Sequence, residues 1–220
     1  LKEVIMIKRN EQGILIVVSG PSGCGKSTVN KMLIDSRKNI IMSVSDTTRA
    51  KRNGEINGVD YNYITKEEFE KNIESDKYLE YAKVHSNKYY GTPSDFVNKK
   101  LKEGIDVILE IDIEGARKVN EKRSDAVFIF IMPPSMEILK SRLINRKTET
   151  KEQVIERFKA AYKEINEVSK YNYVIVNDKI EDSVKRISSI IDAEKSRVDR
   201  IEDIYLGNEE ELIHEILMDM

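Results

Sequence analysis

Residues 20–28 read Gly20-Pro21-Ser22-Gly23-Cys24-Gly25-Lys26-Ser27-Thr28. This is the spacing of a phosphate-binding loop, in which two glycines enclose four residues and the second precedes a lysine and a serine or threonine. Glycines let backbone N–H groups curl around a phosphate, and the start of a helix adds the positive end of its dipole. In such a loop Lys26 can reach the β- and γ-phosphates of a nucleotide, and the Ser27 hydroxyl can ligate Mg²⁺.

The same spacing also occurs in plain glycine turns, so the flanking segments decide between the two interpretations. An apolar run precedes the loop at residues 14–18, and Val29, Met32 and Leu33 follow it at helical spacing. This is the strand–loop–helix arrangement that the motif requires. The sequence therefore predicts that residues 20–28 bind the phosphates of a nucleotide.

The composition limits the partners. The 220 residues carry 37 basic and 39 acidic side chains, a net charge of −2, so no global field attracts nucleic acid or an anionic membrane. No apolar stretch reaches the roughly 18 residues of a spanning helix. Cys24 is the single cysteine, which excludes an intramolecular disulfide and a cysteine zinc cluster and favours a reducing, cytoplasmic setting.

Five short segments rich in Ile and Val have the character of strands that are buried on both faces. They are residues 14–18, 40–44, 107–111, 126–131 and 173–176. Helix-length amphipathic segments lie between the later ones, at 113–121, 136–146 and 151–169. This alternation predicts an α/β fold, a three-layer α/β/α sandwich around a five-stranded parallel sheet.

Residues 45–92 interrupt the alternation with turn signals at Asn53-Gly54 and Asn57-Gly58. A helix is expected from Lys66, with Thr65 as its N-cap, and Tyr78–Val84 alternates like a half-exposed strand. Pro93 is expected at the first position of the next helix. The segment is predicted to be a small α+β insertion.

The expected organisation is a core formed by residues 1–44, 93–135 and 156–200, with the insertion at 45–92. Residues 136–155, which include a polar stretch at 145–150, form a short lid. Residues 201–220 form a helical tail, because Leu212, Ile213, Ile216 and Leu217 make one stripe. That stripe either docks on the domain or forms a partner or homodimer surface. His85 and His214 have no companions for a metal site.

The segment after the second predicted strand carries a run with a resemblance to a known family. Residues 43–52 read Ser43-Val44-Ser45-Asp46-Thr47-Thr48-Arg49-Ala50-Lys51-Arg52, followed by Gly54-Glu55, Gly58 and Asp60-Tyr61-Asn62-Tyr63. Further matching motifs are Glu80, Tyr89-Tyr90-Gly91-Thr92, Glu110-Ile111-Asp112-Ile113-Glu114-Gly115, Pro133-Pro134-Ser135, Arg142-Leu143, Thr148-Glu149-Thr150 and Val176-Asn177-Asp178. With the loop, residues 14–195 resemble the guanylate kinase family. The resemblance implies a P-loop NTPase fold in which residues 45–92 bind GMP.

The resemblance assigns a phosphate pocket to Arg49, Arg52, Tyr61 and Tyr90. Two arginines three residues apart can converge on one phosphate if their loop folds over, and tyrosine hydroxyls add donors that a monophosphate accepts. The alternative is that the two tyrosines merely pack the small domain. One extra residue between His85 and Tyr89, relative to the usual spacing, leaves open whether Tyr89 or Tyr90 meets the phosphate.

Glu80 and Asp112 resemble the guanine-reading carboxylates of the family, with Ser45 and Thr92 as hydroxyl partners. Guanine presents two parallel donors, N1–H and N2–H₂, which a carboxylate can accept. Adenine presents an acceptor at N1, which would leave a buried carboxylate poorly paired. The residues thus support the base that the resemblance implies.

The reaction implied is in-line transfer of a phosphoryl group from ATP to GMP, and to dGMP, in which positioning and charge neutralisation dominate. Lys26 and Mg²⁺ hold the donor phosphates, with Ser27 as the metal ligand. The resemblance makes Arg142, Arg146 and Arg157 the lid arginines that act with Lys26 and Arg49 on the transferring group. Weaker assignments place Asn177 on the base of ATP and Glu110 near Mg²⁺ through water.

Two residues depart from the family pattern. Cys24 lies near Lys26 and a helix N-terminus, which favours a thiolate and predicts sensitivity to thiol reagents. Glu110 stands where aspartate is more usual, which lengthens its reach to a metal.

Two other functions remain open. One is a guanylate-kinase-like module that binds phosphopeptides without catalysis, against which Lys26, Ser27 and the lid arginines argue. The other is a kinase for a different nucleoside monophosphate, against which Glu80 and Asp112 argue.

Overall fold

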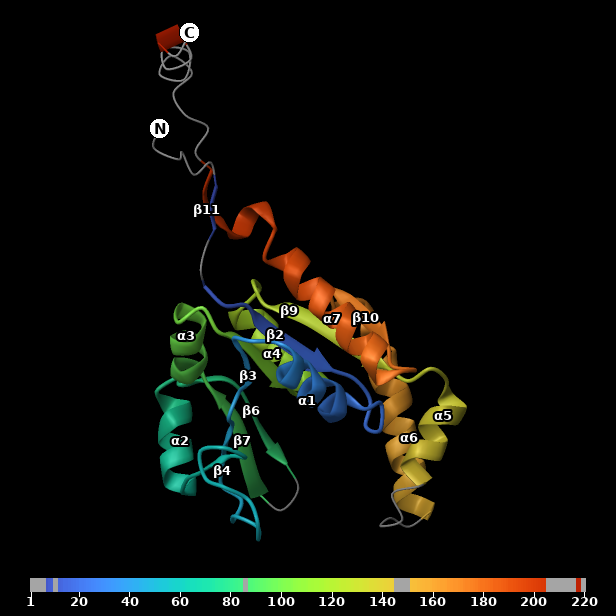
Figure 1. The fold of residues 1–220 in the computed structure, drawn as a ribbon. Helices are drawn as coiled ribbons and strands as arrows, with labels where there is room; N and C mark the ends of the chain where they lie inside the picture. The colour runs from blue at the N-terminus through green and yellow to red at the C-terminus, as the bar shows by residue number, and fades with distance from the viewer. Residues whose placement is uncertain (1–6, 10–11, 85–86, 145–150, 205–216, 219–220) are drawn as a thin grey trace.

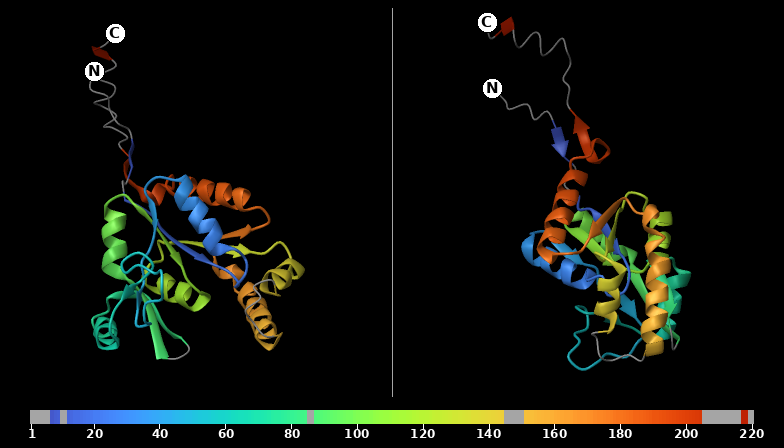
Figure 2. Two further views of the ribbon diagram at one scale, coloured as in Figure 1. Left: turned by 60° about the horizontal axis from the view of Figure 1, so that its bottom comes forward. Right: turned by 90° about the vertical axis from the view of Figure 1, so that its right-hand side faces the viewer.

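The computed structural model describes residues 7–9, 12–84, 87–144, 151–204 and 217–218. A five-stranded parallel sheet forms the middle of three layers, with helices on both faces (Figures 1 and 2). Its strand order is β10-β9-β2-β8-β3. The strands are β2 (Leu15–Ser19), β3 (Ile40–Met42), β8 (Asp106–Glu110), β9 (Val127–Met132) and β10 (Tyr173–Val176). The predicted α/β sandwich with five parallel strands is confirmed.

The strand β2 shows why the sheet needs helices on both faces, because all five of its residues are buried. Ile16 and Val18 pack toward α1 (Lys26–Ser36) and α7 (Ile180–Glu194). Leu15 and Val17 pack toward α3 (Ser94–Lys102) and α4 (Ile113–Lys122). Each fully buried aliphatic side chain contributes about 1.5–3 kcal/mol, which holds β2 and the loop that follows it in the centre of the sheet.

A second, four-stranded sheet in the order β5-β4-β7-β6 carries most of the insertion. Its strands are β4 (Asp46–Thr47), β5 (Asn62–Tyr63), β6 (Tyr78–Val84) and β7 (Lys88–Pro93), and α2 (Lys66–Glu74) packs on it. The core of this unit is Phe69, which is fully buried and stacks on Tyr78 and Tyr89 at ring-centre distances of 4.5 and 5.1 Å. The insertion thus has an aromatic core of its own, while Leu79 of β6 joins the apolar cluster of the main domain.

Two local predictions about the insertion have different outcomes. The Thr65 side chain accepts a hydrogen bond from the Glu68 N–H at 3.1 Å, as the predicted cap requires. Pro93 is the last residue of β7 and caps α3 with an extended backbone, so its predicted place inside the helix is wrong by one residue. The shift has a physical reason, because Thr92 and Pro93 still pair with β6.

The helices α5 (Met136–Ile144) and α6 (Lys151–Ile165) pack on each other through Leu139, Leu143 and Ala161, all buried. A short 3₁₀ turn, η2 (Val168–Lys170), leads from α6 to β10. The boundary predicted after residue 155 falls inside α6, so the structural unit is the helix pair. In Figure 1 the α5–α6 pair lies at the lower right of the main sheet, and the four-stranded sheet lies at its lower left.

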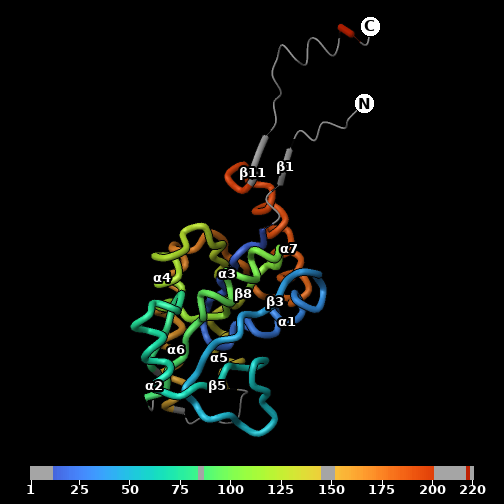
Figure 3. Tube along the Cα trace, turned by 90° about the vertical axis from the view of Figure 1, so that its left-hand side faces the viewer, coloured from blue at the N-terminus to red at the C-terminus, as the bar shows by residue number. Residues whose placement is uncertain are grey.

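The ends of the chain form a two-stranded antiparallel ribbon, in which β1 (Ile7–Arg9) pairs with β11 (Ile201–Ile204) beyond the 3₁₀ turn η3 (Val198–Arg200) (Figure 1). The turn η3 follows α7, which packs beside α1 (Figure 3). Residues 201–204 are thus a strand, which corrects the helical assignment at the start of the predicted tail. Of the predicted tail helix with its stripe up to Leu217, only residues 217–218 are described, and they are helical. The rest of that helix lies outside the described residues, as do His85, His214 and Arg146. Among the helices that are described, none has the length and apolarity to cross a membrane.

Candidate functional site

The loop that follows β2 has a backbone that only glycine accommodates easily. Gly20, Gly23 and Gly25 adopt φ values of +147°, +90° and +94°. A Cβ on Gly20 would lie 2.1 Å from the carbonyl oxygen of Ile131, and one on Gly25 would lie 2.5 Å from Nδ2 of Asn177. The glycines therefore serve both the left-handed conformation and the close packing of the loop on its neighbours.

The loop is supported from beneath by Asn177, whose side chain is 2% exposed. Its Nδ2 donates to the carbonyl oxygen of Cys24 at 2.7 Å, and its Oδ1 accepts from the Ser183 hydroxyl at 3.0 Å. Protein atoms thus occupy both ends of the amide. Asn177 fixes the shape of the loop rather than presenting its amide on the open side.

Three of the predicted cations meet at the loop. Lys26 Nζ donates to the carbonyl oxygens of Gly20 and Pro21 at 2.6 and 3.2 Å. Arg142 on α5 donates to the carbonyl oxygens of Cys24 and Asn177 at 3.5 and 3.4 Å. Arg157 on α6 donates to the Ser22 hydroxyl in a short hydrogen bond. The structure therefore brings Lys26, Arg142 and Arg157 together, whereas Arg146 lies outside the described residues.

Ser27 and Glu110 offer oxygen ligands at the start of α1. The Ser27 hydroxyl donates to Oε1 of Glu110 at 2.6 Å. The described residues contain no group of three His, Cys, Asp or Glu side chains that could hold a metal by themselves. Mg²⁺ commonly takes one or two protein oxygens and completes its shell with substrate phosphates and water. A hydroxyl and a carboxylate beside a phosphate loop fit that pattern.

Cys24 is fully buried, and burial raises the pKa of its thiol above the ordinary value despite the nearby charge of Lys26. The predicted thiolate is therefore wrong. Desolvation of the thiolate outweighs the attraction of Lys26, because the Cys24 side chain packs in the apolar core.

The insertion places Arg49 against two tyrosines. Arg49 Nε donates to the Tyr90 hydroxyl at 3.1 Å, and the guanidinium carbon lies 5.3 Å from the ring centre of Tyr61. Tyr61 and Tyr90 meet edge to face at 5.6 Å. Tyr89 instead stacks on Phe69, so the tyrosine that faces the arginine is Tyr90.

Sequence reasoning gave no role to Glu55, which holds Arg49 in place. Its carboxylate accepts from Nη1 and Nη2 of Arg49 at 2.9 and 2.8 Å, from the Arg52 N–H at 2.7 Å and from the Tyr63 hydroxyl at 2.7 Å. The Arg49 hydrogen bonds, followed by those from Arg52 and Tyr63, lower the pKa of Glu55 to about 2. The only signal in the sequence was its place within the matching run Gly54-Glu55.

The carboxylates of Glu80 and Asp112 lie close together near the C-terminal end of β8. Glu80 is 8% exposed, and its Oε1 accepts from the Thr92 hydroxyl at 2.7 Å across the β6–β7 pair. Asp112 caps α4, with Oδ1 accepting from the Gly115 N–H at 2.8 Å. A Cβ on Gly115 would lie 3.3 Å from Oε2 of Glu80 and 3.4 Å from Oδ1 of Asp112. Burial raises the pKa of Glu80, and the charge of Asp112 adds to the shift.

A cavity of about 460 Å³ lies between the phosphate-loop side of the site and the insertion. It is lined by Ser27, Met42, Ser43, Ser45, Val59, Asp60, Tyr61, Thr92, Leu109, Glu110 and Ile111. Ser27 and Glu110 come from the loop side, whereas Ser45, Tyr61 and Thr92 come from the insertion. Arg52 is exposed and lies at the start of a turn in which its carbonyl oxygen accepts from the Glu55 N–H at 3.3 Å.

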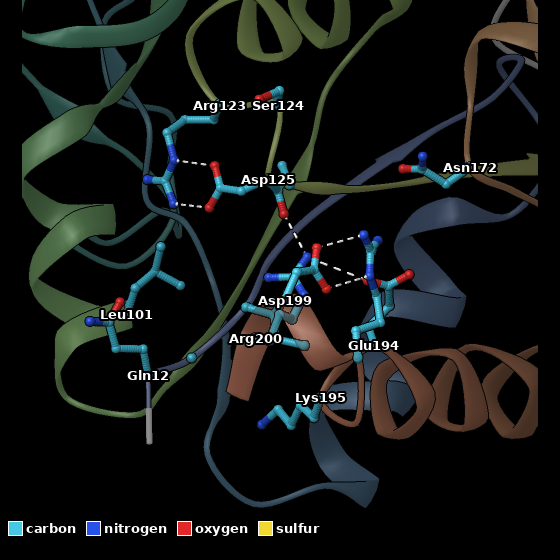
Figure 4. Close-up of a pocket in the computed structure, with 14 residues that line it drawn as sticks. Gln12, Leu101, Arg123, Ser124, Asp125, Asn172, Glu194, Lys195, Asp199 and Arg200 are labelled. Atoms are coloured by element: carbon cyan, nitrogen blue, oxygen red, sulfur yellow. Dashed lines mark hydrogen bonds and ion pairs between the residues drawn. The ribbon is translucent and has the colours of Figure 1, made fainter. Parts of the chain in front are cut away.

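A larger cavity, of about 690 Å³, lies at the opposite end of the sheet (Figure 4). None of the predicted site residues lines it. Most of its charged groups pair with each other, as Figure 4 shows for Arg123 and Asp125, which share two contacts of 2.8 Å. This cavity therefore has no part in the predicted site.

Known proteins match this arrangement over nearly the whole chain. The sequence model of the guanylate kinase family matches residues 12–194. A guanylate kinase of Clostridium tetani is 58% identical over 209 residues, which cover 95% of this chain and 100% of the relative. One from Clostridium perfringens is 56% identical over 213 residues, which cover 97% and 98%.

A solved structure agrees. The crystal structure of guanylate kinase from Anaplasma phagocytophilum superposes with a TM-score of 0.70 at 36% identity and covers 97% of each chain. The family match spans most of the chain, and both clostridial relatives share more than half of their aligned residues with it. The chain belongs to the guanylate kinase family.

Proposed function

We propose that the protein transfers the γ-phosphoryl group of ATP to a phosphate oxygen of GMP. The new P–O bond forms to GMP while the bond to the β–γ bridging oxygen breaks, so that GDP and ADP leave. GMP and dGMP carry the same base and the same phosphate, and dGMP is therefore proposed as a second acceptor.

On the donor side, residues 20–28 bind the β- and γ-phosphates through backbone N–H groups and Lys26. In the free protein Lys26 and Arg157 donate to Gly20, Pro21 and Ser22, and these bonds exchange for bonds to phosphate oxygens when ATP enters. Asn177 acts on ATP through the loop that it supports. Ser27, with Glu110 behind it, would hold Mg²⁺, which supplies charge neutralisation at the donor phosphates.

On the acceptor side, Arg49, Arg52, Tyr61 and Tyr90 bind the GMP phosphate. Glu55 holds the Arg49 guanidinium in one orientation before the substrate arrives, which lowers the entropic cost of binding. Arg49 and the lid arginines Arg142, Arg146 and Arg157 then stabilise charge on the transferring group.

Glu80 and Asp112 read the base, with Thr92 and Ser45 as hydroxyl partners. Ionised Glu80 accepts the two guanine donors, N1–H and N2–H₂. The Thr92 hydroxyl already donates to Oε1 of Glu80 and orients the carboxylate.

One observation supports this proposal above the others: groups of both halves line a single cavity of about 460 Å³. A module that only binds phosphopeptides has no use for Lys26 and Ser27 beside the acceptor pocket. A free thiol at Cys24, in a chain with no second cysteine, supports a reducing, cytoplasmic setting.

The test is an assay with ATP and Mg²⁺ that offers GMP, AMP, CMP and UMP in turn and measures ADP. We expect ADP with GMP far above the other three. Absence of ADP with every acceptor would refute the enzymatic function, and a preference for AMP would refute the base assignment.

A further inference from the structure

Asn30 is a polar side chain in an unexpected place. It lies in α1, three residues after Ser27 and therefore on the same side of the helix, and it is only 1% exposed. Asparagine is a poor residue for a helix interior, and a buried amide costs free energy unless it is hydrogen-bonded. Its Oδ1 has no hydrogen-bond partner among the described residues. A residue with this cost calls for a functional reason.

The other end of the amide provides that reason. Asn30 Nδ2 donates to Oε2 of Glu110 at 2.9 Å, while the Ser27 hydroxyl donates to Oε1 of the same carboxylate at 2.6 Å. Since an ionised carboxylate only accepts, Glu110 fixes which end of the Asn30 amide faces it. Asn30, Glu110 and Ser27 form one chain of hydrogen bonds that ends at the predicted metal ligand.

The order of donors and acceptors in this chain matters for a cation. Because the Ser27 hydroxyl donates its hydrogen bond to Glu110, the lone pairs of the Ser27 oxygen are free to face a metal ion. The cluster borders both the cavity of about 460 Å³ and a neighbouring one of about 250 Å³, so there is space for an ion and its water molecules. Glu110 has one more rotatable bond than the aspartate that is usual at this position. The hydrogen bond from Asn30 restricts rotation about that bond.

We propose that Asn30 is a positioning residue for Mg²⁺, acting through Glu110 on the Ser27 hydroxyl. The inference rests on the proposed role of Ser27 in the ATP site. Asn30 does not touch the metal or the nucleotide. It holds the far oxygen of Glu110 so that the near oxygen stays on Ser27.

A merely structural role makes a different prediction. If Asn30 only tied α1 to β8, its loss would weaken ATP binding equally with and without Mg²⁺, because the whole loop would loosen. If it positions the metal ligand, its loss weakens only the binding that depends on Mg²⁺. The two roles are separated by a binding experiment that needs no turnover.

The experiment is calorimetric titration of ATP into the full chain, at a series of Mg²⁺ concentrations and in EDTA, for wild type and Asn30→Leu. The matched control is Lys38→Gln, an exposed residue just beyond the end of α1. We expect Asn30→Leu to raise the half-saturating Mg²⁺ concentration about 10-fold, with ATP affinity in EDTA unchanged and Lys38→Gln like wild type. Unchanged Mg²⁺ dependence, or equal losses in both buffers, would overturn the proposal.

A double-mutant cycle sharpens the result. Glu110→Asp shortens the side chain that bonds both Ser27 and Asn30, so it should weaken Mg²⁺-dependent binding, and Asn30→Leu should add little to it. Full additivity would show that Asn30 acts elsewhere. Asn30→Ala, which suits a helix and adds no bulk, replaces the leucine variant if that protein does not fold.

The proposed function is checked separately. Wild-type protein that forms no ADP with GMP refutes the function itself. Wild type that forms ADP, beside an Asn30 variant with normal Mg²⁺ dependence, refutes only the role of Asn30.

Discussion

The two halves of the site are built in different ways. The donor half is a main-chain structure: three glycines at positive φ shape residues 20–28, and Asn177 holds the carbonyl of Cys24 from beneath. The acceptor half is a side-chain structure, in which Glu55 holds Arg49 with two hydrogen bonds and Tyr90 accepts a third.

This difference predicts which substitutions should damage each half. A main-chain cradle depends on a few positions that allow its backbone shape and, in this loop, on the charge of Lys26. A side-chain pocket depends on the charge and reach of every member, because each must be desolvated and paired. Apart from Lys26, substitutions in the loop that keep the backbone should therefore spare the donor half, whereas changes of a single charge should damage the acceptor half.

The largest effect is expected for Lys26→Ala, which removes the one side-chain charge that the donor half contributes in the loop itself. Turnover should fall at least about 10²- to 10³-fold, the usual loss when one stabilising donor is removed. Steady-state kinetics with GMP and Mg²⁺-ATP measure it. Lys38→Ala, at an exposed lysine just beyond the end of the same helix, should behave like wild type, and turnover of Lys26→Ala within a few-fold of wild type would show that the loop works without its lysine.

Glu80→Gln should follow, because it removes charge from the acceptor half while keeping the shape. A hydrogen bond to a charged group is worth about 1.5–3 kcal/mol, so affinity for GMP should fall roughly 10- to 100-fold and discrimination against AMP should shrink. Glu114→Gln, an exposed glutamate on α4, is the control. Unchanged discrimination would remove Glu80 from the base site.

The same carboxylate predicts a pH dependence. Burial raises the pKa of Glu80, so the ionised form that accepts the guanine donors is present above that pKa and is lost below it. Affinity for GMP should therefore decline on acidification at a higher pH than an exposed glutamate would give. The phosphate of GMP itself gains a proton at about pH 6, so calorimetry between pH 4.5 and about 8 is carried out on wild type and on Glu80→Gln, and only wild type should show the further decline that Glu80 adds.

A smaller effect is expected for Asn177→Asp, which tests the support under the donor half. The new oxygen would face the carbonyl of Cys24, where Nδ2 now donates at 2.7 Å. Leaving a buried acceptor unpaired costs about 1–3 kcal/mol in the free energy of unfolding. Urea unfolding measures this loss, and Ser183→Ala, which removes only the weaker contact to Oδ1, should cost less. Equal stability of wild type and Asn177→Asp would mean that the loop needs no such support.

The smallest effect is expected for Cys24→Ala, since the side chain points into the core. Turnover should stay within about twofold, while loss of buried volume lowers the free energy of unfolding by about 1 kcal/mol. Native protein should react with thiol reagents far more slowly than unfolded protein, because the buried thiol is neutral. Rapid labelling of the native chain, with loss of activity, would contradict this.

The contrast also explains what the sequence could predict. The loop was identifiable because its glycines, lysine and serine stand in one stretch between a buried strand and a helix. The five strands were identifiable because each is a short run of Ile and Val. Glu80, which we propose reads the base, was assigned only through the family resemblance, since Glu80 alone looks like part of an exposed alternating face.

Other features could not be predicted because they depend on the folded environment. The neutral state of Cys24 follows from desolvation, which no spacing rule contains. Glu55 and Asn30 meet their partners only in the fold: Glu55 is held by a turn that brings Arg49 back, and Asn30 meets a strand 80 residues away. The strand at residues 201–204 needs β1 beside it, which lies at the far end of the chain.

The most direct test of the division into two halves is calorimetric titration of GMP and of Mg²⁺-ATP into Lys26→Ala and Glu80→Gln. If the halves are separate structures, Lys26→Ala loses affinity for ATP and keeps that for GMP, and Glu80→Gln does the reverse. Loss of GMP affinity in Lys26→Ala as large as its loss of ATP affinity would contradict the account.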